Sequence, residues 1–599
     1  MNQPLARPPQ WSGMPSQSDS SWPGSGQVNR TPSKTQYPWH MGKPSGWLKP
    51  KALVLAVLGA TLATPENVAA SQLDVGPDWQ VRFDNSIKAS AIYRLEDADP
   101  RLVDGLEFSG GTPSPQALNF NAGDDNFRKS GIVSRRLDLF SEFDVVYKEQ
   151  YGLRLSGAAW YDAEYQDGKT DAEDATNQQT PMNEFTDETK KVAGKDAELM
   201  DAFVFGGWDV GEEGRLTMRL GRHALQWGES LFFGDNGIAR AQGPIDIYKL
   251  QSSPTAEFKE FIRPVNQFSF QYDLTWDLSI SGYYQLEWEE DRLSPAGTFF
   301  STANVTWGSD YNEFLNLDGD RYLLAPGSTE EPSDSGQFGL QLKLLLGSVD
   351  LGFYLARYHA KDGQLYSQFD VGTFTGGPNG TGRWWYKFPE NITTTGLSAS
   401  TTLGSWNLAA EASVRNNNPL RSKNMIHPNV APQPRLVKGR TAHANLSWLA
   451  SFGPSLVSQE SVFVGEIAWN KVMSKDDPDH TLDHVVTDSA TQLQLVYTPT
   501  WRQALAGLDV NMPVGLRYGL QGNSAAMVSN PEGVGTATLG LTGTYLSVWN
   551  MALNYTHYLG KSEPFLDYGP LKTGGDPEYT DGNPLADRNH ITLTLGRTF

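Results

Sequence analysis

The sequence contains no cysteine, which excludes a disulfide framework, a thiolate metal site and a cysteine nucleophile. After the N-terminal region it also has no apolar run of about eighteen residues, the length that a membrane-spanning helix needs. Basic residues are in the minority, because 48 Lys and Arg stand against 69 Asp and Glu, for a formal net charge of -21. Phosphate neutralisation needs an excess of Lys and Arg, so nucleic acid is excluded as a partner.

What the sequence does have is alternation of apolar and polar residues, the two-residue period of β-strands. The last stretch is typical: Ile591, Leu593 and Leu595 fall on one side, and Thr592, Thr594 and Thr598 on the other. A mean hydropathy of -0.45 would be low for a helical membrane protein. A transmembrane β-barrel is compatible with this low mean hydropathy, because half of its strand residues face a polar lumen.

Eighteen stretches follow this pattern, and the gaps between them are alternately long and short. We predict strands over residues 79–94, 132–147, 151–165, 197–210, 215–226, 266–274, 278–289, 337–346, 349–359, 392–403, 406–415, 439–449, 461–471, 490–498, 508–519, 535–546, 548–559 and 588–599. Short periplasmic turns and long extracellular loops are typical of outer-membrane barrels. The sequence therefore predicts an all-β fold, a closed antiparallel transmembrane barrel of about eighteen strands, with closure removing the unpaired edges.

Interfacial aromatic residues at the strand ends support a membrane location. We expect one girdle at the short-turn end and one at the long-loop end, the latter including Tyr93, Tyr165, Trp288 and Trp469.

The N-terminal region has the three parts of a secretory signal peptide. Lys43, Lys49 and Lys51 precede an apolar run over residues 52–63, and small residues lead up to Ser71. We expect residues 41–70 to be the signal peptide and residues 71–599 to form one barrel domain. Residues 1–40, rich in Pro, Ser, Gln and Gly, are expected to be disordered or to reflect a mis-assigned start.

Several motifs resemble those of a Gram-negative outer-membrane family known as DUF1302. They are Asn121-Ala122-Gly123-Asp124-Asp125-Asn126-Phe127, Gln226-Trp227-Gly228-Glu229-Ser230, Pro244-Ile245-Asp246 and Tyr284-Gln285-Leu286-Glu287-Trp288. The C-terminal Phe599 resembles the closing residue of outer-membrane barrels, which the barrel-assembly machinery reads. The resemblance implies an outer-membrane protein encoded near a periplasmic partner and an exporter, with a role in moving lipidic or steroid-like compounds.

Charged residues on the polar faces of the strands are the candidates for a solute pathway. The lumen candidates are Arg82, Lys88, Arg136, Glu142, Arg154, Asp162, Arg219, Gln285 and Glu287. Four of them, Arg82, Arg136, Arg154 and Arg219, predict a basic arc, with Phe140, Trp160 and Tyr283 as inward aromatic neighbours. Charge rings select ions and anionic groups, but opposite charges on neighbouring strands can equally form a structural lattice.

The gap after residue 226 holds a candidate constriction loop with Trp227, Glu229 and Asp246. A long loop of this composition could fold into the barrel, and an ordinary extracellular loop is the alternative. Two weaker patterns are the acidic, histidine-containing run over residues 476–484 and a partial calcium-loop pattern over residues 316–320. We interpret the first as a solvated loop and the second as a turn, and expect no metal site, cofactor or catalytic residue.

These observations predict an outer-membrane channel or transporter for small molecules, with hydrophobic or amphipathic compounds such as lipids, steroids or carboxylates as candidates. Barrels of this size leave an aqueous channel unless they are plugged. The expected partners are outer-membrane lipid and lipopolysaccharide, the barrel-assembly machinery, a solute, and a periplasmic partner with its exporter. A binding or structural protein with a closed lumen is the alternative, and a barrel hydrolase is a third.

Overall fold

The computed structural model describes residues 71–599 except 74, 104–106, 110–111, 114–120, 169, 173–182, 305, 310–311, 316–320, 370–378, 423–435, 477–481 and 568–577. Residues 68–599 form one compact unit. The expected signal peptide and leader, residues 1–70, lie outside the described residues, as do the calcium-loop pattern at 316–320 and part of the run at 476–484.

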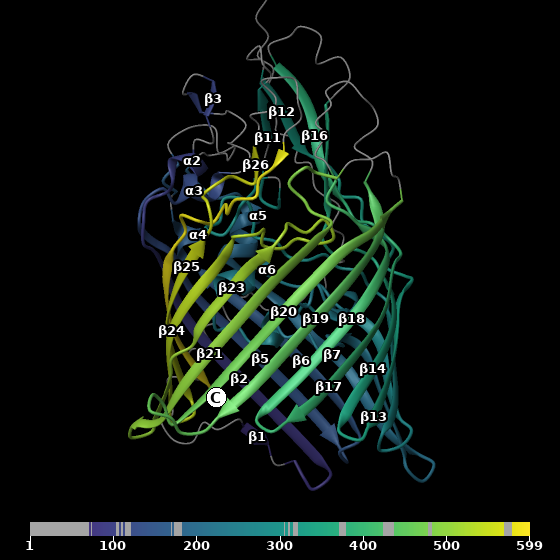
Figure 1. The fold of residues 1–599 in the computed structure, drawn as a ribbon. Helices are drawn as coiled ribbons and strands as arrows, with labels where there is room; N and C mark the ends of the chain where they lie inside the picture. Colours follow the sequence, from purple (N-terminus) through teal and green to yellow (C-terminus); the bar gives the residue numbers. More distant parts are fainter. Residues whose placement is uncertain are drawn as a thin grey trace, which may run out of the picture. The chain divides into compact units, whose positions relative to one another are not determined.

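A single antiparallel sheet closes on itself to form the barrel (Figure 1). The closure is made by β2, which pairs with β5 on one side and with the last strand, β28, on the other. The prediction of eighteen barrel strands is confirmed. They are β2 (Trp79–Arg94), β5 (Gly131–Tyr147), β6 (Tyr151–Asp162), β7 (Lys195–Val210), β8 (Gly214–His223), β9 (Val265–Asp273), β10 (Leu278–Gln285), β13 (Gln337–Leu346), β14 (Val349–Tyr358), β17 (Ile392–Leu403), β18 (Trp406–Pro419), β19 (Lys438–Phe452), β20 (Glu460–Lys475), β21 (Ser489–Leu505), β22 (Leu508–Asn511) continued by β23 (Val514–Gln521), β24 (Gly535–Tyr545), β25 (Trp549–Leu559) and β28 (His590–Thr598).

The alternation places apolar side chains outside and polar ones inside. On β28, Leu593 is 58% exposed on the outer face, whereas its neighbour Thr592 is fully buried on the inner face. The same contrast recurs along the other strands, so an apolar belt surrounds a polar interior, as lipid requires.

Pro513 divides the strand predicted over residues 508–519. The residues on either side, Asn511 and Val514, keep the same register against β24, so β22 and β23 are one strand with a local break. Proline has no amide hydrogen, which explains the interruption of the ladder. The strand predicted over 490–498 is longer than expected and runs to Leu505, leaving only a tight turn at Ala506 and Gly507.

The remaining elements lie in the connections, mostly at the long-loop end (Figure 1). The short strands are β1 (Ser71–Leu73), which pairs with β2, and β3 (Glu107–Ser109), β4 (Thr112–Pro113), β11 (Asn312–Leu315), β12 (Arg321–Pro326), β15 (Gln364–Phe369), β16 (Asn379–Lys387), β26 (Leu566–Asp567) and β27 (Glu578–Tyr579). The helices are α2 (Pro100–Val103), α3 (Ala122–Asn126), α4 (Ala163–Asp167), α5 (Asp187–Thr189), η3 (Lys190–Gly194), η4 (Ile238–Ala241), α6 (Ile247–Ser252) and α7 (Phe258–Phe261). Among the described residues, no helix has the length and apolar character needed to cross a membrane.

An apolar cluster fills the mouth of the barrel at the long-loop end. Ile92, on the inner face of β2, packs there with Tyr165, Tyr248 and Phe299. The prediction that Tyr165 belongs to an interfacial girdle is therefore wrong, and so is that for Trp288, which is buried and donates a hydrogen bond to the carbonyl of Ala360. The loops that fold over the mouth form a hydrophobic core there, and the strand pattern alone does not predict that core.

Candidate functional site

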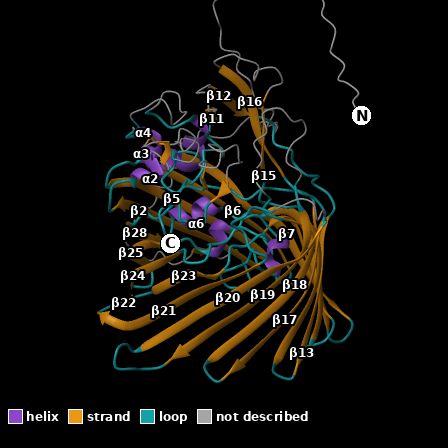
Figure 2. Ribbon diagram, turned by 45° about the horizontal axis from the view of Figure 1, so that its top comes forward, coloured by secondary structure: helices purple, strands orange, loops and turns teal. Residues whose placement is uncertain are grey.

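The connection between β8 and β9, residues 224–264, enters the barrel; we call it the inserted segment. Figure 2 shows its helix α6 enclosed by the strands. The segment contacts inward-facing side chains on strands far apart around the barrel, including Glu411 on β18, Glu466 on β20, Lys88 on β2 and Asp138 on β5. It therefore bridges two sides of the lumen wall.

Two buried carboxylates bind the first half of the inserted segment. Glu466 accepts hydrogen bonds from the hydroxyl of Ser230 (2.8 Å) and from the backbone amides of Leu231 (3.0 Å) and Phe233 (3.1 Å). Glu411 accepts from the amides of Glu229 (2.7 Å) and Ile238 (3.1 Å). Backbone amides that converge on a carboxylate satisfy its charge, so residues 229–238, which we call the anchor arm, are fixed through their main chain.

Glycine is required where the anchor arm approaches Glu411. Gly228 has a φ of +94°, and a Cβ there would lie 2.4 Å from the Glu411 carboxylate. A Cβ at Gly237 would lie 2.3 Å from the other oxygen of the same group. The arm can lie against the carboxylate only because both positions lack side chains.

Aromatic packing completes the anchor. The ring of Trp227 lies 5.0 Å from that of Tyr283 on β10 and 6.4 Å from that of Tyr354 on β14, and Ile238 joins the same buried cluster. The predicted constriction residue Trp227 thus packs against the wall, whereas Glu229 uses its main chain to bind Glu411 and its carboxylate lies 3.9 Å from the ammonium of Lys343.

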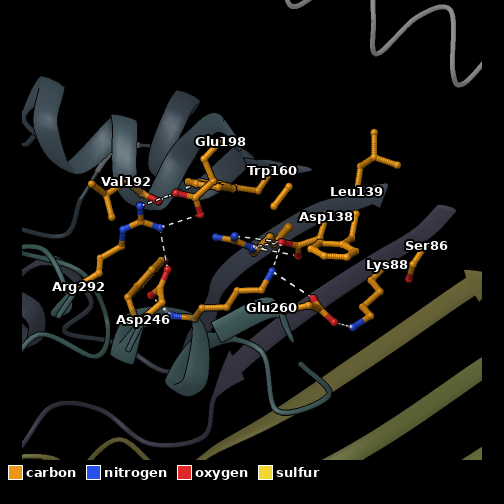
Figure 3. Close-up of a pocket in the computed structure, with 15 residues that line it drawn as sticks. Ser86, Lys88, Asp138, Leu139, Trp160, Val192, Glu198, Asp246, Glu260 and Arg292 are labelled. Atoms are coloured by element: carbon orange, nitrogen blue, oxygen red, sulfur yellow. Dashed lines mark hydrogen bonds and ion pairs between the residues drawn. The ribbon is translucent and has the colours of Figure 1, made fainter. Parts of the chain in front are cut away.

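The second half of the inserted segment meets the opposite wall through ion pairs (Figure 3). Asp246, the third predicted constriction residue, caps α6 by accepting from the amide of Lys249 (2.7 Å) and pairs with Arg292 (2.7 Å). Arg292 also pairs with Glu198 on β7 (2.6 Å), and Lys249 with Asp138 on β5 (2.5 Å).

The last part of the segment, residues 254–261, projects as a tip that includes α7. A capping box between Glu257 and Glu260 begins this helix. Glu260 pairs with Lys88 on β2, and Lys259 pairs with Glu142 on β5. Lys88 also donates to the carbonyl of Thr255 (3.1 Å).

A small cavity lies between the second half of the segment and the wall. It is lined by Lys88, Arg136, Asp138, Trp160 and Glu260 among others, and its volume of about 20 Å³ is enough for one water molecule. The indole of Trp160 has the guanidinium of Arg136 at 5.4 Å and that of Arg292 at 5.8 Å. The lining charges are paired with one another, and these ion pairs stabilise the contact between segment and wall.

The structure separates the predicted basic arc into two parts. Arg82, which is 61% exposed, pairs with Asp84, and Arg154 pairs with Asp144 at 2.6 Å. Arg219 is also exposed, with its guanidinium 5.8 Å from the ring of Phe203.

Arg136 does not share this exposure, because its side chain is buried under the inserted segment and pairs with Asp138 at 3.0 Å. The prediction of one continuous accessible arc is therefore wrong. The predicted aromatic neighbours Phe140, Trp160 and Tyr283 are buried for the same reason.

The other predicted lumen residues have structural partners. Asp162 caps α4 and accepts from the hydroxyl of Ser134 (2.5 Å). Gln285 donates to the carbonyl of Gln242, and Glu287 pairs with Arg222 at 3.0 Å. Lys88 and Glu142 hold the tip, as described above.

Sequence reasoning missed Glu411 and Glu466. Each stands between small or apolar neighbours, as in Ala410-Glu411-Ala412 and Gly465-Glu466-Ile467. An isolated inward carboxylate without a basic partner on an adjacent strand is the signal that could have identified them, because a buried charge needs hydrogen-bond donors from elsewhere.

A buried charged cluster joins the inserted segment to the loops at the barrel mouth. Arg240 donates to Asp291 and to Asp362, both at 2.7 Å. Lys361 lies beside them with its ammonium buried and, among the described residues, without a hydrogen-bond partner. Burial, together with the nearby guanidinium of Arg240, lowers the pKa of Lys361 to about 7.

Within the described residues, no group of three or more His, Cys, Asp and Glu is placed to hold a metal ion. His484 and Asp483, from the run at 476–484, lie 3.5 Å apart in a loop.

Comparison with known families identifies the chain. The family model described as protein of unknown function (DUF1302) matches residues 50–599. The chain belongs to the DUF1302 family. No curated protein sequence is significantly similar to this DUF1302 protein.

Solved structures with a similar arrangement are barrels of very different sequence. OccAB1 of Acinetobacter baumannii has 9% identity and a TM-score of 0.39, over 87% of this chain and 96% of its own. OccK1 (OpdK) of Pseudomonas aeruginosa has 8% identity and a TM-score of 0.38, over 88% and 100%. OmpF of Salmonella typhi, in a complex with daunomycin, has 7% identity and a TM-score of 0.32, over 88% and 100%. TM-scores this low carry no argument about function.

Proposed function

We propose that this DUF1302 protein is an outer-membrane channel for small amphipathic carboxylates, of the lipid-like or steroid-acid-like kind. The barrel has the apolar exterior and polar interior that insertion into a bilayer needs. The main-chain pairing of Phe599 with Asn85, at 2.8 and 2.9 Å, brings the terminal aromatic residue to the closing seam. We expect it there to be recognised by the assembly machinery in the outer membrane of a Gram-negative bacterium.

The proposed class of solute rests on one observation: apolar side chains are exposed on the inserted segment, and basic side chains are exposed on the wall. Leu231, Leu250 and Phe258 on the segment are 45–50% exposed, although the segment is otherwise largely buried. Arg154 and Arg219 on the wall are accessible cations. An anionic group can pair with the guanidiniums while an apolar body contacts the leucine and phenylalanine side chains, whereas a sugar would gain little from the apolar surface.

The test is flux through the purified barrel in liposomes. Replacing Arg154 and Arg219 together by Gln should lower the flux of fatty acids and bile-acid-like steroids and shift ion selectivity toward cations, with folding unchanged. Arg502→Gln, which removes an exposed cation near the short-turn end of β21, is the matched control and should leave both the flux and the ion selectivity unchanged. Unaltered selectivity after the double substitution would contradict the proposal.

A closed-lumen binding protein is the second candidate. It is favoured by the inserted segment, which contacts the wall on both sides of the lumen and has a water-sized cavity beside it on the side of β2 and β5. Reconstituted barrels that bind amphipathic acids but conduct no ions under any condition would support this function over the channel.

A further inference from the structure

The two sides of the inserted segment are attached to the wall by different kinds of contact. The anchor arm is bound through its main chain, since Glu411 and Glu466 accept from backbone amides and Arg415 donates to the carbonyls of Asp235 and Gly237, both at 2.8 Å. Moving this arm would break several buried hydrogen bonds at once, removing the backbone amides from Glu411 and leaving Glu466 with Asn445 as its donor.

The strands hold the tip, residues 254–261, through side chains and not through their main chain. In the described part of the chain, the hydrogen bonds and ion pairs that join the tip to the strands pass through Lys88 on β2 and Glu142 on β5. The ammonium of Lys259 also lies 5.1 Å from the ring of Phe140 and remains partly exposed. The Lys88–Glu260 pair is largely buried, whereas the Lys259–Glu142 pair is partly exposed, and exposed ion pairs between long side chains are weak and are screened by salt.

The tip begins and ends at fixed points. On one side, Tyr248 of α6 is buried in the apolar cluster at the barrel mouth. On the other, Ile245 and Ile262 form a β-bridge, and the amide of Asp246 donates to the carbonyl of Phe261 at 2.7 Å. The tip therefore lies between two fixed points, and Glu260 also pairs with Lys249 of α6 at 3.7 Å.

We infer that the tip is a gate, latched to the wall by the Lys88–Glu260 and Lys259–Glu142 pairs and opened when these pairs break, while the anchor arm stays in place. The inference rests on the proposed channel function, since it assigns the moving part of that channel. Release of the tip uncovers the inner face of β2 and β5, including Ser86 and the cavity beside it. An anionic solute that competes with Glu142 for Lys259 would release the tip in the same way as salt.

The test uses the absence of native cysteine. Ser86→Cys places one thiol on the wall beneath the tip, and its rate of modification by a water-soluble thiol reagent reports the position of the tip. Adding Lys259→Glu, which faces Glu142 with a like charge, should raise that rate about tenfold, because an attractive pair becomes a repulsive one. The swap Lys259→Glu with Glu142→Lys should restore the slow rate, and raised salt should speed the reaction in the Ser86→Cys protein.

The matched control is Arg215→Glu, the same charge reversal at an ion pair with Asp209 near the short-turn end. It should leave the labelling rate of Ser86→Cys unchanged. Equal rates with and without Lys259→Glu, or no restoration by the swap, would overturn the gate. Because labelling needs no transport, fast labelling without ion conductance in the Lys259→Glu barrel would refute the channel and leave the movable tip established.

Discussion

Arg588 and Asp124 lie 464 residues apart in the chain and form a buried bidentate ion pair, with Nε–Oδ1 at 3.0 Å and Nη2–Oδ2 at 2.7 Å. Arg94, at the end of β2, donates to the same carboxylate at 3.3 Å and to Asp587 at 2.7 Å. The four side chains join the first and last barrel strands to α3, so the loops are fastened over the seam where the barrel closes.

Asp124→Asn should destabilise the barrel, because it leaves two buried guanidiniums without their shared carboxylate. Breaking one side of a buried ion pair costs about 3–5 kcal/mol. The measurement is the temperature at which the folded, fast-migrating band is lost in heat-modifiable gel electrophoresis. Asp209→Asn, at the exposed pair with Arg215, should shift that temperature little, since such pairs contribute about 0–1 kcal/mol. Equal shifts for the two variants would show that the seam network is not stabilising.

Glu466→Gln should loosen the anchor arm. The NH2 of a Gln would replace one of the two carboxylate oxygens and so face either the hydroxyl of Ser230 or the amides of Leu231 and Phe233, donor against donor, at a cost of about 1–3 kcal/mol. We expect faster proteolysis within residues 229–238 and larger, noisier single-channel currents. Glu460→Gln on the same strand, whose carboxylate pairs with Arg502 at the surface, is the control and should change neither. An anchor arm that resists protease equally in both variants would contradict its assignment.

The barrel could be predicted from the sequence because the polarity of each strand residue matches the face, lipid or lumen, toward which it points. Leu593 and Thr592 differ in polarity because one faces outward and the other inward, and that difference is present in the sequence before any folding. The alternation of short turns and long loops between the strands is a second pattern that could be recognised in the sequence. Pro513 marks a break in the strand that is confined to Met512 and Pro513, because the register is the same on either side of them.

The interior of the barrel could not be predicted in the same way. Whether Arg136 faces water depends on where residues 224–264 fold, and the pairs that place them join residues more than 100 positions apart, such as Lys249 with Asp138. Ile92 illustrates the same limit, because an apolar residue on the polar face of β2 makes sense only once the loops pack on it. The composition of residues 224–264 left a loop folded into the barrel and an ordinary extracellular loop as alternatives, and it gave no sign of the anchors Glu411 and Glu466.

The outer face gives a direct test of register. Leu541 on β24 is exposed on the outer surface, and Thr542, the next residue, faces inward. Leu541→Arg should cost about 2–4 kcal/mol near the bilayer midplane, whereas Thr542→Arg should be tolerated in the polar lumen. Folded yield and urea stability in lipid vesicles measure the difference. If the order of the two effects were reversed, the register of β24 would have to be shifted by one residue.

The buried amine of Lys361 should make stability depend on pH. Its pKa is about 7 in the folded protein against an ordinary value of 10.5, so between these values the unfolded chain binds more protons than the folded one. Stability from this group therefore rises with pH across that window, and the cost of the buried ammonium is fully present below about pH 7. Arg240, Asp291 and Asp362 surround the amine without a hydrogen bond to it, which is why burial dominates.

Lys361→Met shortens the side chain by one atom and removes its charge, so it should stabilise the folded barrel at neutral pH. The advantage over the native protein should shrink as the pH is raised toward 10.5, where the unfolded chain also loses this proton. Thermal loss of the folded gel band, measured for both proteins at several values from pH 7 upward, gives the difference directly. Lys343→Met, at a part-exposed lysine on β13, is the control and should show a small, pH-independent effect. A constant offset between the native and Lys361→Met proteins across the whole range would mean that the amine is charged and solvated in the folded state.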